Sequence, residues 1–473
     1  MTGFRNRLVF VSLVILSILS SGCQAPIMSA TDAPIVAGPD QALVTLYLEA
    51  SGSVSPDLSL TLSDVEVLHE GVWMPVVSAP VGVSAGKVRD HQVLLGLGVL
   101  PAGRHEQFRL RVTGVRDGRK ELPMVTGDVF VSLRADSPIS LDAGDSHCLF
   151  LQWHLDDCID DKGRFVPYFQ LKDQAEPLTS ELLYILCDEI NTIYLVRSDR
   201  NFVVYSLPLE GPVSDLRLDS GQQLLYILSS GARSILVFDC KRNRLVDRVA
   251  LPVSVEPRYL DLSSDASFAF VTDAATDKIV KVDLQSGRLV QQANVGYQPG
   301  RILYFDYSGS GRLAVSSPDS QQVFLLDADS LQVTSSLSAG FQPEGLLATD
   351  DTLYVCDRGS QTVTAYSLRT RSVLSNIPVG REPVALASDG GSKIYVANYG
   401  ERSLSVVAMG QNVALRQIPV DAGPFSFAYL NHRRVLYVAN RKARSVTALD
   451  VAGEKAFASI ALGGRPLFMA VQD

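Results

Sequence analysis

The sequence predicts an all-β protein in which an N-terminal β-sandwich is followed by a seven-bladed β-propeller. Two observations carry this prediction. Short segments rich in Val, Ile, Leu, Tyr and Thr recur at a fixed period through the last three-fifths of the chain, and a fixed period is typical of repeat architectures. Before them, alternating strands are separated by Pro, Gly, Asp and Asn, and no long helical period appears.

Residues 1–23 have the pattern of a targeting segment. A basic start precedes an uncharged, mostly apolar run over Leu8–Leu19, which is too short for an ordinary membrane-spanning helix. Residues 19–23, LSSGC, resemble a bacterial lipobox. The resemblance implies cleavage before Cys23 and attachment of diacylglycerol and a palmitate-type acyl chain there. Gln24 follows, which implies an outer-membrane location without indicating the face. The alternative is an ordinary secreted protein in which Cys23 is incidental.

Residues 24–40 are rich in Ala, Pro, Ser and Gly and predict a flexible tether. Residues 41–173 predict the sandwich. Residues 100–110, LPAGRHEQFRL, resemble the "LPAGxYxQxRL" stretch of a bacterial surface domain with a transthyretin- or immunoglobulin-like fold, although His105 stands where Tyr is usual. Alternating strands are expected at Leu43–Glu49, Leu58–Leu68, Val72–Val77, Gln92–Leu97, Glu106–Val112 and Asp128–Ala135.

Residues 178–473 carry the repeats. The segment 393–407, KIYVANYGERSLSVV, reads as a strand, a polar turn and a second strand. From Tyr395 the chain advances 29 residues to Pro424, and four other repeats have the same offset. The proline cannot donate to a sheet ladder, so it marks the first residue of a new strand. Successive prolines lie 40 to 45 residues apart, which fits four short strands per blade.

The two ends of the repeat region complement each other. A single strand, LFMAVQD, follows Pro466, and the segment around Tyr184 supplies three strands before Pro212. We expect the last strand to complete the first blade, because an unclosed ring would leave exposed sheet edges. A two-sheet sandwich or separate hairpins are the alternatives, and the constant offset argues against both.

The repeat resembles the YVTN-type bacterial β-propeller repeat over about residues 180–473. The residues that carry the resemblance are IYVAN at 394–398 and LYVAN at 436–440, followed by SVxxxD and IxVGxxP patterns. The resemblance implies a propeller fold and names no ligand.

The charge balance and the cysteine pattern argue against several classes of function. The chain has 42 basic and 51 acidic residues, a net charge of −9, which argues against a nucleic-acid surface. The six cysteines form no CxxC motif, so neither a zinc ribbon nor a c-type haem is predicted. Cys148 and Cys158 are disulfide candidates in an exported protein, and two separate buried thiols are the alternative. No metal or cofactor motif is recognised.

An enzyme is not predicted. Propeller enzymes place their chemistry where the inner strands begin, and the residues directly after the repeat prolines include Arg258, Glu344 and Phe425. Glu344 is the single carboxylate of that ring, whereas a lactonase-type metal-dependent hydrolase needs several oxygen ligands. Such a hydrolase remains the alternative function, since function is argued from the site and not from the fold.

Loops between the second and third strands should lie on the same face as the proline loops. Those loops carry basic and aromatic side chains, of types enriched at binding hot spots, and fewer acidic residues lie beside them in the sequence (Asp357, Glu382 and Glu401). We therefore expect a locally basic recognition face on a lipid-anchored binding or scaffolding protein of the cell envelope, with a protein or an anionic envelope ligand as partner. The candidate residues are Arg258, Glu344, Arg358, Tyr399, Arg402, Phe425, Lys442 and Arg444, and Arg381, Arg441 and Arg465 lie in the same loops.

Overall fold

The computed structural model describes residues 37–126, 129–176 and 181–472. The predicted targeting segment with Cys23, and most of the predicted tether, lie outside these residues. Within the described ranges, no helix is long and apolar enough to cross a membrane.

Strands dominate the described N-terminal part, as the alternating pattern predicts. Its ten strands hydrogen-bond in one order, β3-β2-β6-β8-β10-β9-β1-β5, with β4 beside β2 and β7 beside β6. The elements are β1 (Gln41–Ser51), β2 (Leu58–His69), β3 (Val72–Val77), β4 (Val81–Ser84), α1 (Ala85–Val88), β5 (Val93–Pro101), β6 (Gly103–Asp117), β7 (Lys120–Glu121), β8 (Phe130–Leu141), β9 (Ser146–His154) and β10 (Phe169–Asp173).

One hydrophobic core lies beneath this sheet. Strands β8 and β10 are joined by the pairing of Leu171 with Ala135, so the two halves of the sheet are hydrogen-bonded to each other. Leu60 and Phe108 from one half and Trp153 from the other belong to the same buried cluster. The all-β prediction is confirmed for this part.

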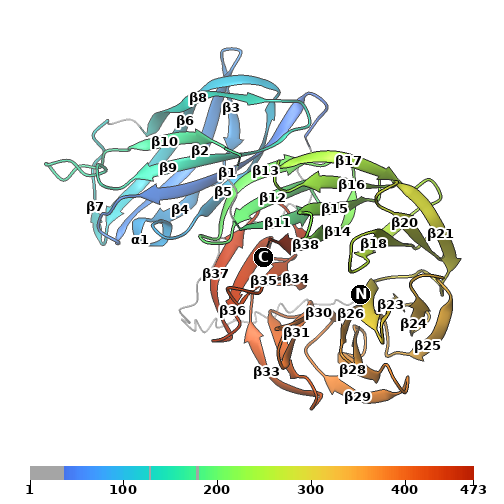
Figure 1. Cartoon of the computed structure of the whole chain (residues 1–473). Helices are drawn as coiled ribbons and strands as arrows, with labels where there is room; N and C mark the ends of the chain where they lie inside the picture. The colour runs from blue at the N-terminus through green and yellow to red at the C-terminus, as the bar shows by residue number, and fades with distance from the viewer. Residues whose placement is uncertain (1–36, 127–128, 177–180, 473) are drawn as a thin grey trace, which may run out of the picture. The chain divides into compact units, whose positions relative to one another are not determined.

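Seven four-stranded sheets make up residues 182–471 of the described chain, and Figure 1 shows them succeeding one another around a ring. In hydrogen-bonded order they are β13 (Phe202–Pro208), β12 (Thr192–Arg197), β11 (Leu182–Cys187) and β38 (Pro466–Val471); β14 (Val213–Asp219), β15 (Leu224–Ser229), β16 (Ser234–Asp239) and β17 (Arg244–Ala250); β18 (Pro257–Leu262), β19 (Phe268–Asp273), β20 (Lys278–Asp283) and β21 (Arg288–Asn294); β22 (Ile302–Tyr307), β23 (Ser310–Ser317), β24 (Gln322–Asp327) and β25 (Val333–Ser338); β26 (Pro343–Thr349), β27 (Thr352–Asp357), β28 (Thr362–Ser367) and β29 (Val373–Pro378); β30 (Pro383–Ser388), β31 (Lys393–Asn398), β32 (Ser403–Ala408) and β33 (Val413–Pro419); β34 (Pro424–Leu430), β35 (Val435–Asn440), β36 (Ser445–Asp450) and β37 (Lys455–Ala461).

The inner strands form a closed circuit. Each contacts the next in the order β14, β18, β22, β26, β30, β34 and β38, and β38 contacts β14 again. Strand β38 also pairs antiparallel with β11, with Leu183 opposite Val471 and Leu186 opposite Phe468. The first and last strands of this region therefore share one sheet, and the arrangement is a β-propeller-like fold.

The repeated residue types hold neighbouring sheets and turns together. Tyr226 and Phe270 are almost fully buried, and each belongs to a cluster with residues of the following sheet, such as Val271 and Leu313. The Asp that ends the third strand accepts local backbone hydrogen bonds, as Asp239 does from the Lys241 N–H at 2.8 Å. Such local hydrogen bonds are the reason that Asp favours turns.

The N-terminal part packs directly against the first propeller sheet. Strand β9 is buried on both faces: Leu151 lies in the N-terminal core, and Phe150 lies in a second cluster with Tyr194 and Val203 of the propeller. This explains why β9 shows no polar alternation and was not predicted as a strand. Thr45 Oγ1 and Tyr194 OH lie 2.8 Å apart across the same fully buried contact.

Two glutamine side chains cover the outer edge of β13. Gln92 accepts a hydrogen bond from the Val203 N–H at 3.0 Å and donates to the Val203 carbonyl at 2.9 Å. Gln174 makes the same pair of contacts with Ser206, at 3.1 and 3.4 Å. Each amide therefore takes the place of a neighbouring strand at an edge that would otherwise be open.

Candidate functional site

A buried arginine lies at the centre of the strand ring, just before β22. The Arg301 side chain is surrounded by three aromatic rings from other inner strands: its guanidinium carbon is 4.6 Å from the Tyr259 ring centroid, 5.3 Å from Phe425 and 4.5 Å from Phe468. Arg301 is only 8% exposed. We call Tyr259, Phe425 and Phe468 the aromatic box.

Two nitrogens of Arg301 have no hydrogen-bond partner in the described part of the chain. They are Nε and Nη2, and both are shielded from solvent. The guanidinium is held by ring faces, which attract a cation without accepting its N–H groups in directed bonds. Buried donors are normally paired, and Arg301 is the only arginine of the described residues in which two buried nitrogens lack a partner.

A second arginine of the same ring, the partly buried Arg217, has acidic partners for its guanidinium. Arg217 Nη1 lies 2.6 Å from Asp215 Oδ1, and its Nε lies 3.0 Å from Asp261 Oδ1. The carboxylates also accept backbone N–H groups of the next sheets: Asp215 from Leu260 at 2.9 Å and Asp261 from Tyr304 at 2.7 Å. Burial raises the pKa of Asp215, although Arg217 and Arg301 oppose the shift.

Side chains from three loops extend the aromatic box toward the surface. Tyr399 makes an edge contact with Phe425 at 6.0 Å. Lys442 Nζ lies 4.1 Å from the Tyr399 ring centroid and donates to the Tyr399 carbonyl at 3.0 Å. Arg358 lies 5.5 Å from the Tyr399 ring and Arg441 4.9 Å from Phe425. We call these five residues the loop cluster; its predicted members Arg358, Tyr399, Phe425 and Lys442 are indeed brought together.

The face does not carry the excess of basic charge that the sequence predicts. Most of the arginines have acidic partners. Four of these, Glu256, Glu344, Asp188 and Glu189, are not among the acids expected beside the loops, and the last two lie more than 250 positions from their partners in the chain. The ion pairs are Arg258–Glu256, Arg358–Glu344, Arg358–Glu382, Arg381–Glu401, Arg441–Asp188, Arg444–Glu189 and Arg465–Glu189.

The remaining predicted site residues have different surroundings. Burial raises the pKa of Glu344, against the opposing effect of Arg301 and Arg358. Arg402 and Lys442 are exposed, and in the described ranges neither has a carboxylate within ion-pair distance. Arg258 and Arg444 are engaged in their ion pairs and do not contact the loop cluster through any described interaction.

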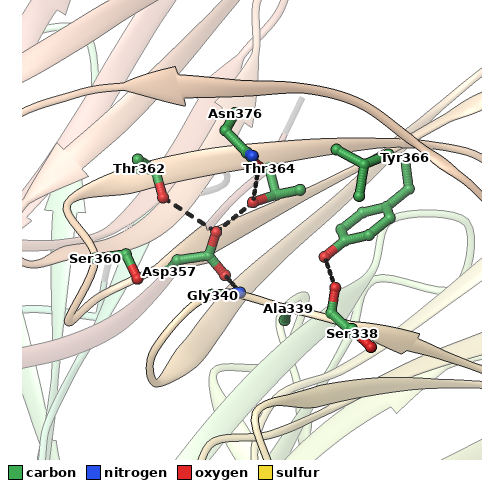
Figure 2. Close-up of a pocket in the computed structure, with 10 residues that line it drawn as sticks. Ser338, Ala339, Gly340, Asp357, Ser360, Thr362, Thr364, Tyr366 and Asn376 are labelled. Carbon is green, nitrogen blue, oxygen red and sulfur yellow. Dashed lines mark hydrogen bonds between the residues drawn. The ribbon is translucent and has the colours of Figure 1, made fainter.

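A pocket of about 360 Å³ lies on the sheet β26–β29, and Arg301 and the aromatic box are not among its lining residues. Figure 2 shows Asp357 in it, accepting hydrogen bonds from the Gly340 N–H at 2.9 Å, from Thr362 at 3.2 Å and from Thr364. Asp357 ends its strand where Asn398 ends β31, and Asn398 likewise bonds the hydroxyl groups of the following strand. The polar lining is therefore part of the repeat.

The predicted Cys148–Cys158 disulfide is not formed. Both thiols are free and buried. Cys148 lies in the cluster shared with the propeller and donates to Ser206 Oγ at 3.3 Å, whereas Cys158 lies in the N-terminal core and donates to the Leu155 carbonyl at 3.0 Å. The two side chains face opposite sides of β9, so the alternative of two separate thiols holds.

Histidines and carboxylates are not grouped as a metal site in the described residues, where no three His, Cys, Asp or Glu side chains converge suitably. His147 contacts Asp145 at 3.3 Å and also Asp173. The pKa of His147 is raised to about 9: burial acts in the opposite direction, and the two carboxylates outweigh it.

Residues that sequence reasoning missed lie one position further along the inner strands. The residue directly after each repeat proline was considered, whereas Tyr259, Arg301 and Phe468 each stand two positions after it. Period-two alternation does not find them, because Phe425, directly after its proline, lies in the same aromatic box as Tyr259. The strand register shifts just after the proline in both β18 and β34.

No protein-family model matches the chain, and no curated protein matches it. Among solved structures, it is similar to a functionally unknown protein from Desulfotomaculum acetoxidans DSM 771, with a TM-score of 0.55 and 13% identity over 62% of this chain and 99% of that one. At this identity the likeness concerns the fold alone.

Two further solved structures are more distant. Hydrazine synthase of Kuenenia stuttgartiensis has a TM-score of 0.48 and 18% identity over 54% of this chain and 88% of that one. Dihydro-heme d1 dehydrogenase NirN in complex with DHE has a TM-score of 0.48 and 12% identity, covering 62% and 76%. Neither likeness bears on the function of this chain.

Proposed function

We propose that this protein is a binding module of the cell envelope, in which a seven-bladed, YVTN-type propeller on a β-sandwich recognises a protein or an anionic ligand. One observation carries the proposal: the loop cluster joins aromatic and cationic side chains from separate sheets, and it continues inward to Arg301. Tyr399 and Phe425 are partly buried, and aromatic rings beside arginine are of the types that dominate binding energy at interfaces.

The face is charge-balanced at its ion pairs, so specificity would come from Arg402 and Lys442, whose charges are not neutralised by a neighbouring carboxylate. Unpaired rim charges steer an acidic partner and make its capture sensitive to salt. The alternative, a lactonase-type metal-dependent hydrolase, receives less support, because Arg358 already engages both Glu344 and the nearby Glu382.

Double substitution of the two unpaired basic residues tests the recognition face. Arg402→Glu with Lys442→Glu should weaken capture of an acidic envelope partner about tenfold, or ~1.4 kcal/mol, and flatten its salt dependence. The melting temperature should stay close to that of the wild type, because exposed charges contribute little to stability. The measurement is crosslinking and pull-down from native envelopes, with the partner identified by mass spectrometry.

The matched control is the double variant Lys241→Glu with Arg369→Glu, which makes the same charge change in loops at the opposite ends of the strands. This variant should capture the partner as the wild type does. Unchanged capture by the first variant would contradict the proposal. The binding surface would then be sought at the pocket of about 680 Å³ in the N-terminal part, which Trp73 and Phe108 help to line.

We propose that the protein is anchored by lipid attached to Cys23. The residue that follows, Gln24, supports the outer membrane as its location. In a Gram-negative expression host, Cys23→Ala should move the protein from the outer-membrane fraction to the soluble or inner-membrane precursor fraction, because a single thiol carries the diacylglycerol. Fractionation with a carbonate wash and labelling with a palmitate analogue measure this. A mutant that remains with the outer membrane would show that Cys23 is incidental.

A further inference from the structure

We infer that the aromatic box is a carboxylate-binding site, in which Arg301 binds the two oxygens of the ligand through its Nε and Nη2 groups. The inference rests on the proposed function, because Phe425 belongs to both the aromatic box and the loop cluster. It goes further by naming the chemistry of the ligand and the residue that binds it.

The unpaired nitrogens have the geometry that a carboxylate requires. Nε and Nη2 point from the same edge of the planar guanidinium, and parallel N–H bonds from one edge match the spacing of two carboxylate oxygens. Both nitrogens lack a partner and are buried. A buried donor without an acceptor is unfavourable, so the ligand-free site is incomplete in a way that an oxyanion would correct.

No carboxylate of the described residues fills this position. Asp215 Oδ1 binds Arg217, and its Oδ2 accepts the Leu260 N–H. Glu344 Oε2 lies 3.5 Å from Arg358 Nη1. Both acids are close enough to influence Arg301 electrostatically, as the opposing effect of Arg301 on their pKa values indicates, yet neither forms a hydrogen bond with it.

A planar monoanion fits these surroundings better than phosphate does. The rings of Tyr259, Phe425 and Phe468 surround the guanidinium and offer apolar contact to a flat ligand body. A single unpaired cationic edge compensates one negative charge. A phosphate dianion would place its second charge near Asp215 and Glu344, where like charges repel.

Access requires movement of a ring at the outer side of the box. Phe425 is partly buried and contacts Tyr399 and Phe468 through ring faces and edges. Side-chain rotation of such a residue breaks no hydrogen bond. The ligand would enter from the loop cluster, past Tyr399, as Phe425 turns aside.

Benzoate is the probe, and its neutral isostere benzamide is the ligand control. Benzoate should raise the melting temperature of the wild-type protein above that in sodium chloride of equal ionic strength, and benzamide should not. Arg301→Met should fold with a melting temperature within a few degrees of the wild type, because Asp215 and Glu344 keep Arg217 and Arg358, and it should lose the benzoate shift. Arg258→Met, an exposed arginine of the same ring, should retain it.

A second measurement observes the arginine itself. In protein labelled with ¹⁵N-arginine, the Nε signal that disappears in Arg301→Met should move on addition of benzoate. The inference is overturned if the wild-type melting temperature and this signal are both unaffected, if Arg301→Met keeps the benzoate shift, or if inorganic phosphate stabilises more than benzoate. A large loss of stability in Arg301→Met without ligand would also overturn it, by showing that the guanidinium is structural.

The two proposals fail separately. Loss of partner capture in the Arg402→Glu and Lys442→Glu variant, with no effect of benzoate on Arg301, overturns the carboxylate site and leaves the recognition face. A benzoate effect that depends on Arg301, with unchanged capture by that variant, supports the carboxylate site and contradicts the recognition face.

Discussion

Deletion of residues 467–473 is expected to abolish the cooperative unfolding transition. The deletion removes most of β38, whose side chains Leu467, Phe468, Met469 and Val471 are each at most 9% exposed. Burial of one such side chain contributes about 1.5–3 kcal/mol, so their combined loss approaches the total stability of ~5–15 kcal/mol typical of a folded protein. Strand β11 would also lose its inner partner.

Circular dichroism melts and size-exclusion chromatography measure the result. The truncated chain should melt broadly and form larger species, because an unpaired inner edge is a template for association. A chain that lacks residue 473 alone is the control and should behave as the wild type. Cooperative melting of the truncated chain at the wild-type temperature would contradict the prediction.

Arg217→Met should destabilise the protein by about 3–5 kcal/mol, the range for breaking a buried ion pair by removing one partner. The substitution leaves Asp215 fully buried, and Asp261 mostly buried, without their cation. The free energy of unfolding from denaturant titration is the measurement. Arg301→Met is the control, since it removes an arginine of the same ring that is more deeply buried and that, in the described residues, has no carboxylate hydrogen-bonded to it.

Acidification should recover part of this loss. The pKa of Asp215 is already raised by burial, and removal of Arg217 takes away a group that lowers it. A carboxyl with a higher pKa in the folded than in the unfolded state stabilises the fold when it is protonated. The difference between variant and wild type should therefore shrink from neutral to mildly acidic pH. Equal stability of Arg217→Met and Arg301→Met at neutral pH would contradict the distinction between the two arginines.

Local patterns in the sequence predicted the strands and the residues of the loop cluster. They could not predict contacts between segments that are distant in the chain. Tyr399 and Lys442 could be placed on one face because each occupies the same loop of its repeat. Asp188 and Glu189 could not, since their pairing with Arg441 and Arg444 depends on the first and last sheets lying side by side. Cys148 was misassigned for a similar reason: its environment is set by Ser206 of another part of the fold.

Arg301 illustrates a different limit. Its position two residues after Pro299 was readable, but an arginine at the start of a strand is ordinarily solvated. Only the approach of Tyr259, Phe425 and Phe468 from three other strands makes it a buried, unpaired cation, and burial of that kind depends on the whole ring.

The pairing of β38 with β11 also sets a time order for folding. The contact joins segments almost as far apart as the propeller allows, and contacts of large sequence separation form slowly. Synthesis delivers the N-terminal segments first, so the ring stays open until β38 has left the ribosome or, for an exported chain, the translocation channel. Every molecule therefore passes through an open-ring stage in which β11 lacks its inner partner, and the duration of this stage is governed by how soon β38 is released.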